Sequence, residues 1–390
     1  MDRQPLTIVE IDLEQCGLTY GAGACTALLG VTGQHKCFGG YKHCQVRSAF
    51  LKTVKTIRFA QNVSGLPGGV HLYPCLKSVS TRSAEINLSG VDPNSTALGV
   101  RANVTVNLLD FADSDLSIDP YADQRRSGAA QADGIGYDPM DRSTFLRKLK
   151  VRFPFWNARP LRVLTGYVGD ALEDMTTRHY VISDWTGPDA SGACQIVAKD
   201  VFDLTEDEKA VIPTLSRGKL KDDIDANATS LVLEPETVGA EYAAAGRICV
   251  GSEVMTFTRS GDVLTVARGA DGTNVATHGA GDLAQQCERI TGTIPAAIHH
   301  VLTVGDAGPV PADWIDLAEW ETEAVGWLGG IEVRATITAP KSRRKLVGER
   351  CQLGALLCPV QVARKIPFRA DRPRVPGDTA HPLPDDGPVV

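Results

Sequence analysis

Short runs rich in β-branched and apolar residues recur through the first half of the chain, separated by the turn formers Gly, Pro, Asn and Asp. The runs cover residues 57–61, 84–90, 100–111, 161–170, 178–185 and 194–202. Runs of this length with this punctuation are typical of antiparallel sandwiches and barrels. We therefore expect a mainly β fold with barrel-type domains. A short helix is predicted at 141–153, with Asp141 or Ser143 as its N-cap.

The predicted secondary structure of the second half of the chain differs between two parts, a strand-rich part and a part with helices. A charged stretch at 203–220 is followed by a compact strand-rich unit at about 221–288, where Ser260-Gly261-Asp262 lies between two strand-like runs as a hairpin signal. Helical periodicity then appears at 292–306 and 311–330, a strand is predicted at 331–340, and a helix is predicted at 341–358. Trp314, Trp320 and Trp327 are spaced by six and seven residues, which predicts one buried helix face.

A chain of 390 residues exceeds what one hydrophobic core usually organises, so we expect several domains. The expected fold class is mainly β with an α+β part, including a small inserted β-domain and a C-terminal domain that contains helices. The expected bounds are a cysteine-rich region at 1–80, a β-barrel domain at 81–215, the small β-domain at 216–290, an α+β domain at 291–370 and a linker at 371–390.

Composition excludes some functional classes. The net charge of −7 argues against a dedicated nucleic-acid-binding protein, which usually carries a basic surface that neutralises phosphates. No apolar run is long enough to span a membrane, and the charged N-terminus lacks the apolar core of a secretory signal. We therefore expect synthesis in the cytoplasm and no membrane span.

Four of the ten cysteines lie close together: Cys16, Cys25, Cys37 and Cys44, with the spacing C-x8-C-x11-C-x6-C. Seven glycines lie between or beside them, so the backbone there can bring distant thiols to one point. In a chain without a secretory signal, a local cysteine cluster indicates metal or redox chemistry before a disulfide framework. Four thiolates suit a [4Fe–4S] cluster or tetrahedral zinc, and the spacing alone does not choose between them.

Other roles for these cysteines stay open at this point. They are alternatively two disulfides or reduced thiols that are simply buried. Cys75 is a reserve ligand, and a mixed zinc site with His35 or His43 is a further option. The scattered Cys194, Cys249, Cys287, Cys351 and Cys358 are expected to be small buried residues.

Catalytic signatures are missing from the sequence. There is no P-loop, no G-x-S-x-G elbow, no H-E-x-x-H and no G-x-G-x-x-G fingerprint. The basic group Lys341, Arg343, Arg344 and Lys345 is expected to be a solvated helix start or a contact to an acidic neighbour. His278 is expected to stabilise a turn. We therefore name no catalytic residue and expect no enzyme.

Several longer segments together carry a resemblance to a known family. They are IVEIDLEQCGLTYGAGACTALLGVTGQHKCFGGYKHCQ at 8–45, FAQNVSGLPGG at 59–69, RHYVISDWTGPDASGACQIVAKDVFDLTEDEKAVIP at 178–213, VGSEVMTFTRSGDVLTVARGADGTNVATHGAGD at 250–282, and DWIDLAEWETEAVGWLGGIEVRATITAPKSRRKLVGE at 313–349. In this order, over about residues 7–385, the chain resembles the tail hub and tail-tip proteins of long-tailed phages, including gene-transfer-agent-like hubs.

The resemblance implies a structural virion protein at the tail tip. Such hubs assemble as homotrimers, cap the tail tube, dock to the distal tail protein ring and support fibre or spike proteins during DNA delivery. They meet the host surface indirectly, and DNA passes only through the lumen. The resemblance also favours an iron–sulfur cluster at Cys16, Cys25, Cys37 and Cys44 over zinc. The alternatives are a metal-dependent tail-associated enzyme and a glycan-binding tail-tip module.

Overall fold

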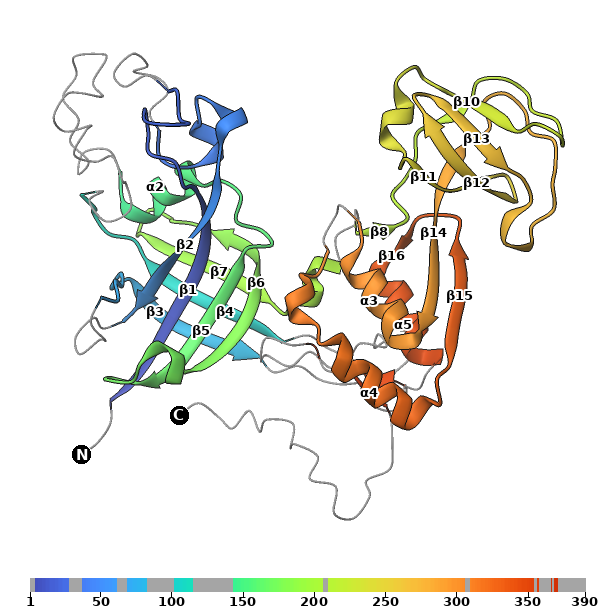
Figure 1. The fold of residues 1–390 in the computed structure, drawn as a ribbon. Helices are drawn as coiled ribbons and strands as arrows, with labels where there is room; N and C mark the ends of the chain where they lie inside the picture. The colour runs from blue at the N-terminus through green and yellow to red at the C-terminus, as the bar shows by residue number, and fades with distance from the viewer. Residues whose placement is uncertain are drawn as a thin grey trace. The chain divides into compact units, whose positions relative to one another are not determined.

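The computed structural model describes residues 4–27, 37–61, 69–82, 102–114, 143–205, 210–305, 309–353, 356–357, 366 and 368–370. These residues form two compact units. The first holds the strands before residue 202, and the second holds nearly all described residues after it (Figure 1). No described helix is long and apolar enough to cross a membrane.

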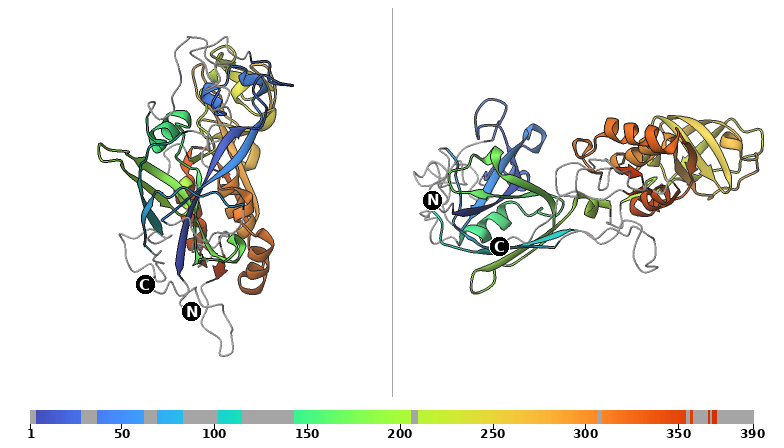
Figure 2. Two further views of the ribbon diagram at one scale, coloured as in Figure 1. Left: turned by 90° about the vertical axis from the view of Figure 1, so that its left-hand side faces the viewer. Right: turned by 90° about the horizontal axis from the view of Figure 1, so that it is seen from below.

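The first unit is a curved seven-stranded antiparallel sheet in the order β2-β1-β5-β6-β7-β4-β3. Its strands are β1 (Pro5–Cys16), β2 (Lys52–Ala60), β3 (Leu76–Arg82), β4 (Asn103–Leu109), β5 (Pro160–Tyr167), β6 (Thr176–Thr186) and β7 (Ala193–Lys199). Tyr73, just before β3, bonds through its backbone to Arg58 and Ala60 of β2, so the two edges approach each other. The result is a half-barrel, and both views of Figure 2 show its blue-to-green strands curving around.

Helix α2 (Phe145–Arg152) packs on this sheet. Phe145, Leu146 and Leu149 are fully buried, and the Phe145 ring lies 4.3 Å from Tyr73 and 4.9 Å from Phe111. The helix is where the sequence predicts it, but its cap is not. Thr144 is the N-cap residue without a side-chain cap bond, and the Oδ1 of Asp110 accepts the Leu146 N–H at 2.8 Å. A carboxylate distant in sequence therefore satisfies this helix start.

The second unit contains a seven-stranded antiparallel sheet in the order β15-β14-β11-β12-β13-β10-β9. Its strands are β9 (Lys219–Leu220), β10 (Ser230–Glu234), β11 (Ala245–Val250), β12 (Glu253–Ser260), β13 (Val263–Ala267), β14 (Ala284–Thr293) and β15 (Glu332–Ile337). A bridge from Lys219 of β9 to Leu283, beside the start of β14, brings the edge strand β9 back to the start of β14. We call residues 218–287 the small β-module; its core includes Leu231, Ile248, Met255 and Phe257.

Three helices complete the second unit: α3 (Ile294–Thr303), α4 (Leu317–Leu328) and α5 (Arg343–Leu353). Short strand pairs join β8 (Val211–Ile212) to β16 (Lys341–Ser342) and β17 (Leu356–Leu357) to β18 (Arg369–Ala370). Thr293 and Asp316 cap α3 and α4 through side-chain bonds to Ala296 and Glu319. The remaining helical turns are 3-10 segments at Tyr41–His43, Arg47–Ala49, Leu172–Asp174, Val201–Thr205, Val238–Glu241, Ala270–Gly272 and Ala312–Trp314.

The expected fold class is confirmed, because two antiparallel sheets dominate and the long helices lie mostly near the C-terminus. The hairpin at Gly261-Asp262 is also confirmed between β12 and β13. The tryptophan prediction is wrong in part. Trp314 and Trp320 are buried, whereas Trp327 near the end of α4 is 45% exposed. The expected helix at 341–358 ends at Leu353, and Leu356–Leu357 form a strand.

Some expectations fall on residues outside the described ranges. These are the strand at 84–90, His35, Cys358 and the C-terminal linker. The domain bounds expected from the sequence stay predictions.

Candidate functional site

The cysteine-rich segment begins where β1 ends. Cys16 is the last residue of β1, and its N–H donates to Gly39 O at 2.7 Å, which brings the segment around Cys37 back to the strand end. Gln45, next to Cys44, donates from Nε2 to the Tyr20 hydroxyl at 2.9 Å. The stretches that hold the first two and the last two cysteines are therefore tied together at two points.

The same segment also rests on helix α2. The Arg152 guanidinium lies 4.4 Å above the Phe38 ring, and a Cβ on Gly40 would approach Arg152 O to 3.0 Å. Gly39 has a φ of +77°, a conformation that glycine adopts without strain. These contacts hold the backbone between Cys37 and Cys44 against a packed part of the first unit.

All four cysteine side chains are partly exposed. The Sγ of Cys37 accepts the Gly39 N–H at 3.4 Å, the type of backbone bond that stabilises thiolate sulfurs in metal sites. Within the described ranges no group of three or more His, Cys, Asp or Glu side chains is arranged to hold a metal ion. The donor chemistry fits a thiolate site, and the assembled ligand set stays a prediction.

Cys75 fits the reserve-ligand role poorly. It is buried, and burial together with the negative charge of Asp110 and the neighbouring Cys194 raises its pKa to about 12. A thiol held protonated in this way is a weak ligand, because metals bind the thiolate. The scattered cysteines behave mostly as expected, since Cys194, Cys249 and Cys351 are buried, whereas Cys287 is only partly buried.

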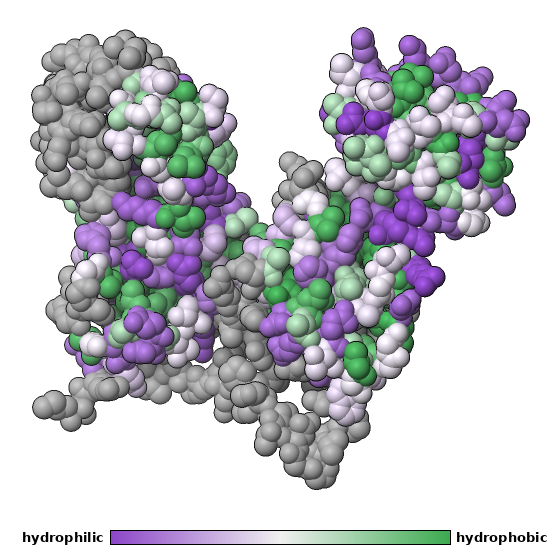
Figure 3. Space-filling view, viewed as in Figure 1, coloured by the Kyte–Doolittle hydropathy of each residue, from purple (hydrophilic) through white to green (hydrophobic). Residues whose placement is uncertain are grey.

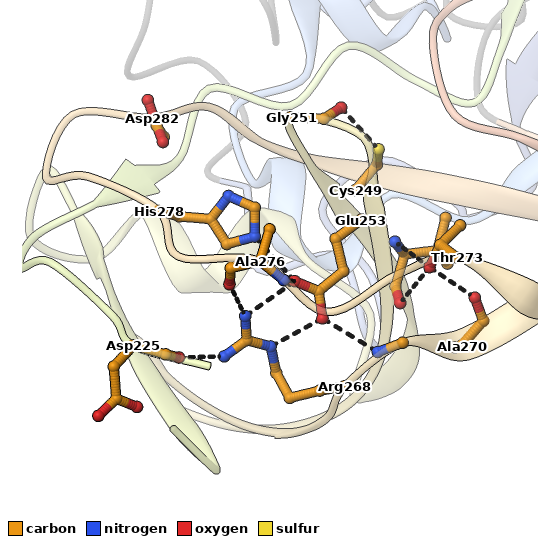
Figure 4. Close-up of polar contacts among 12 residues, drawn as sticks. Asp225, Cys249, Gly251, Glu253, Arg268, Ala270, Thr273, Ala276, His278 and Asp282 are labelled. Carbon is orange, nitrogen blue, oxygen red and sulfur yellow. Dashed lines mark hydrogen bonds and ion pairs between the residues drawn. The ribbon is translucent and has the colours of Figure 1, made fainter. Parts of the chain in front are cut away.

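A second cluster, not recognised from sequence, lies in the small β-module around Glu253 (Figure 4). The carboxylate of Glu253, at the start of β12, accepts two hydrogen bonds of 2.8 Å from Arg268 and contacts His278 Nε2 at 2.9 Å. The backbone N–H groups of Gly269 and Ala276 donate to the same carboxylate. The expectation that His278 stabilises a turn is confirmed by this contact and by its burial.

The electrostatics of this cluster follow from these bonds. Burial by itself would raise the pKa of Glu253, but the bonds from Arg268, His278 and the two backbone N–H groups lower it from 4.5 to about 2. Glu253 is completely inaccessible to solvent, so its oxygens are not available to a substrate. The cluster connects β12, the residue after β13 and the loop before β14. These bonds therefore stabilise the small β-module.

The surface of the small β-module does not present the aromatics that sugar binding would need. Tyr242 and Phe257, the aromatic residues of this region, are both buried in its core. The face seen in Figure 3 mixes hydrophilic, intermediate and apolar residues. The glycan-binding alternative therefore gains no support from these two residues.

The basic group at the start of α5 was expected to be solvated, and one of its residues, Arg343, is not. Lys341 and Lys345 are exposed, but Arg343 is fully buried. Its Nη1 donates to the Val301 carbonyl at 2.9 Å and the Leu302 carbonyl at 3.3 Å, in the last turn of α3. A cation is favoured at a helix C-terminus, which explains why this arginine lies inside instead of in solvent.

Comparison with known proteins gives few matches. No family model matches the chain, and no curated protein matches it. Among solved structures, the chain is similar to a chain of the structure described as "Virion of native gene transfer agent (GTA) particle". The TM-score is 0.22 and the identity 10%, over 72% of this chain and 78% of that chain.

Proposed function

We propose that this chain is a structural protein of a phage-like virion and acts as the hub of its tail tip. In this role it forms a homotrimer, caps the tail tube, docks to the distal tail protein ring and supports fibre or spike proteins during DNA delivery. The proposed location is the virion tail tip, with synthesis in the host cytoplasm.

The observation that carries the proposal is the ordered set of family-like segments over about residues 7–385. The most patterned of them, at 250–282, contains Glu253 together with Arg268 and His278, and both of these side chains contact Glu253 in a buried cluster. The residues that carry the resemblance there serve to hold a small β-module together.

We also propose that the cysteine segment holds a [4Fe–4S] cluster, with zinc as the alternative. The ligands would be Cys16, Cys25, Cys37 and Cys44, and the cluster would stabilise a glycine-rich segment that has little apolar content of its own. The contacts of this segment with β1 and α2 would place the cluster beside the half-barrel. A metal-dependent tail enzyme is the second candidate function.

Immunoelectron microscopy tests the location directly. Antibodies against this chain should label one end of purified particles from the producing strain, at the tip of the tail. Deletion of the gene should yield particles without a complete tail tip, restored by a plasmid copy. Label on no part of the particle, together with normal tails in the deletion strain, would reject the virion role.

Oligomeric state is a separate test. Light scattering coupled to size-exclusion chromatography should give the mass of three chains for the purified protein, or for its complex with the distal tail protein. A stable monomer in both preparations would reject the hub while leaving a different virion role open.

A further inference from the structure

The sheet of the second unit is continuous only through β14. This strand pairs with β11 through Ala284–Cys287 and with β15 through Glu288–Thr293. The two pairings share no residue, so the step from Cys287 to Glu288 joins the small β-module to the paired strands β14 and β15, which we call the β14–β15 pair. We call this step the β14 joint. No strand neighbour of β14 spans the joint, since β11 ends its pairing at Cys287 and β15 begins its pairing at Glu288.

An open cavity of about 850 Å³ lies beside the β14 joint. Gly246, Arg247, Cys287, Glu288 and Arg289 are among the residues that line it. On this side, the joint therefore borders open space.

One carboxylate spans the joint. Asp271, in the 3-10 turn after β13, belongs to the small β-module, as does Arg247 of β11, which it pairs with at 2.9 Å. On the other side of the joint, Asp271 pairs with Arg289 of β14 at 3.0 Å and accepts a hydrogen bond from Thr336 of β15 at 2.5 Å. Arg289 and Thr336 are register partners and also bond to each other at 2.8 Å.

The environment of Asp271 strengthens these contacts. Its side chain is only 11% exposed, so water screens the ion pairs weakly. Burial would raise its pKa, but the Thr336 bond and the charges of Arg247 and Arg289 lower it, so Asp271 is charged at neutral pH. Asp271 itself has a φ of +53°, and the following glycine a φ of +81°. The turn thus holds an unfavourable backbone conformation that presents the carboxylate to both sides.

We infer that Asp271 is a latch that fixes the orientation of the small β-module relative to the β14–β15 pair. The contacts to Arg289 and Thr336 close the β14 joint, and their loss frees the module to rotate there while the module itself stays folded. This inference does not depend on the proposed virion role. In an assembled hub, the same latch would set the angle at which the module meets its neighbours.

Hydrogen–deuterium exchange of the full chain tests the latch with Asp271→Asn. Backbone amides of 288–293 and 332–337 should exchange faster by on the order of tenfold, because the charged hydrogen bonds that hold these strands to the module are lost. Amides of 253–267, in the core strands of the module, should keep their wild-type rates. Wild-type exchange at 288–293 and 332–337 would overturn the inference.

Two further variants keep this test decisive. Arg289→Gln removes the partner of Asp271 on the β14–β15 pair and should speed exchange of the same amides. This variant tests the inference if Asp271→Asn unfolds the module. Asp262→Asn is the matched control, since the Asp262 carboxylate accepts bonds from Thr237 and Gly239 inside the module. It should speed exchange near 237–239 only. Equal loosening of the β14 joint by Asp262→Asn would also overturn the inference.

Discussion

The carboxylate of Glu253 is bound to the guanidinium of Arg268 by two parallel hydrogen bonds of 2.8 Å, and both side chains are buried. Fifteen positions separate the two residues in the sequence, and they meet because β12 and β13 form a hairpin that ends beside the start of β12. The pair therefore ties the two ends of this hairpin together inside the small β-module.

Glu253→Gln should destabilise the small β-module strongly. Removing one partner of a buried ion pair leaves the other charge uncompensated, which costs about 3–5 kcal/mol. Exchange-monitored urea unfolding of 245–267 should show the loss. Arg217→Gln is the control, because its pair with Glu241 lies largely in solvent, and it should leave the same transition unchanged. Equal midpoints for Glu253→Gln and wild type would contradict the importance of this pair.

Acid should weaken the module in a defined range. The pKa of Glu253 is depressed in the folded state, so its stabilising contribution is complete above about pH 4.5 and is lost as pH falls toward 2. The difference corresponds to on the order of 3 kcal/mol. Unfolding free energies of the module measured between pH 6 and roughly pH 2 should fall in this window, and less so in Glu253→Gln. If the stability of the module falls with pH equally in Glu253→Gln and in wild type, groups other than Glu253 cause its acid sensitivity.

The cysteine segment should bind metal. Anaerobic purification should give broad absorption near roughly 400 nm with about four irons per chain, and Cys37→Ser should lose both. Cys287→Ser is the control, since Cys287 lies in the small β-module. About one zinc without colour would retain the thiolate site and remove the iron–sulfur assignment. Wild-type protein without any metal would reject the site.

Arg162→Met should weaken the half-barrel at β1. Arg162 donates to both oxygens of Asp12 at 2.7 Å and to Glu10 at 2.7 Å. The substitution removes both of these bonds from Asp12 and one of the two arginine partners of the buried Glu10, which keeps Arg58. The bonds also explain why the pKa of Asp12 is low despite its burial. The free energy of unfolding measured by amide exchange in β1, β2 and β5 should fall by about 1–3 kcal/mol. Lys52→Met, which breaks the exposed pair with Glu14, should have little effect.

Arg343→Met should leave the thermal unfolding midpoint of the chain unchanged or raise it relative to wild type. Burial lowers the pKa of Arg343, and its Nε and Nη2 have no hydrogen-bond partner among the described residues. Replacing a poorly compensated buried charge with an apolar side chain of similar length is often neutral or stabilising. Thermal unfolding of the full chain measures the change. A marked drop in the midpoint would mean that the two bonds to the end of α3 outweigh the cost of burying the cation.

Local signals in the sequence were enough for much of the fold. The strands at 161–167, 178–185 and 194–199 and the β12–β13 hairpin depend on neighbours within a few residues, so alternation and turn residues predicted them. The short helix at 145–152 was predicted in the same way, but its cap was not. Asp110 lies 36 positions before Leu146, and only the packing of α2 on the sheet brings the two together.

What the sequence by itself determined is therefore the mainly β class, the small β-module and the donor chemistry of Cys16, Cys25, Cys37 and Cys44. The tertiary structure decided which charges meet and which side chains are buried. Asp271 joins Arg247, Arg289 and Thr336, Arg343 lies inside at the end of α3, and Trp327 lies outside. The physical reason is the separation in sequence over which each interaction acts. Periodicity and turn chemistry depend on neighbours within a few residues, whereas burial and ion pairing depend on distant chain segments that only folding brings together.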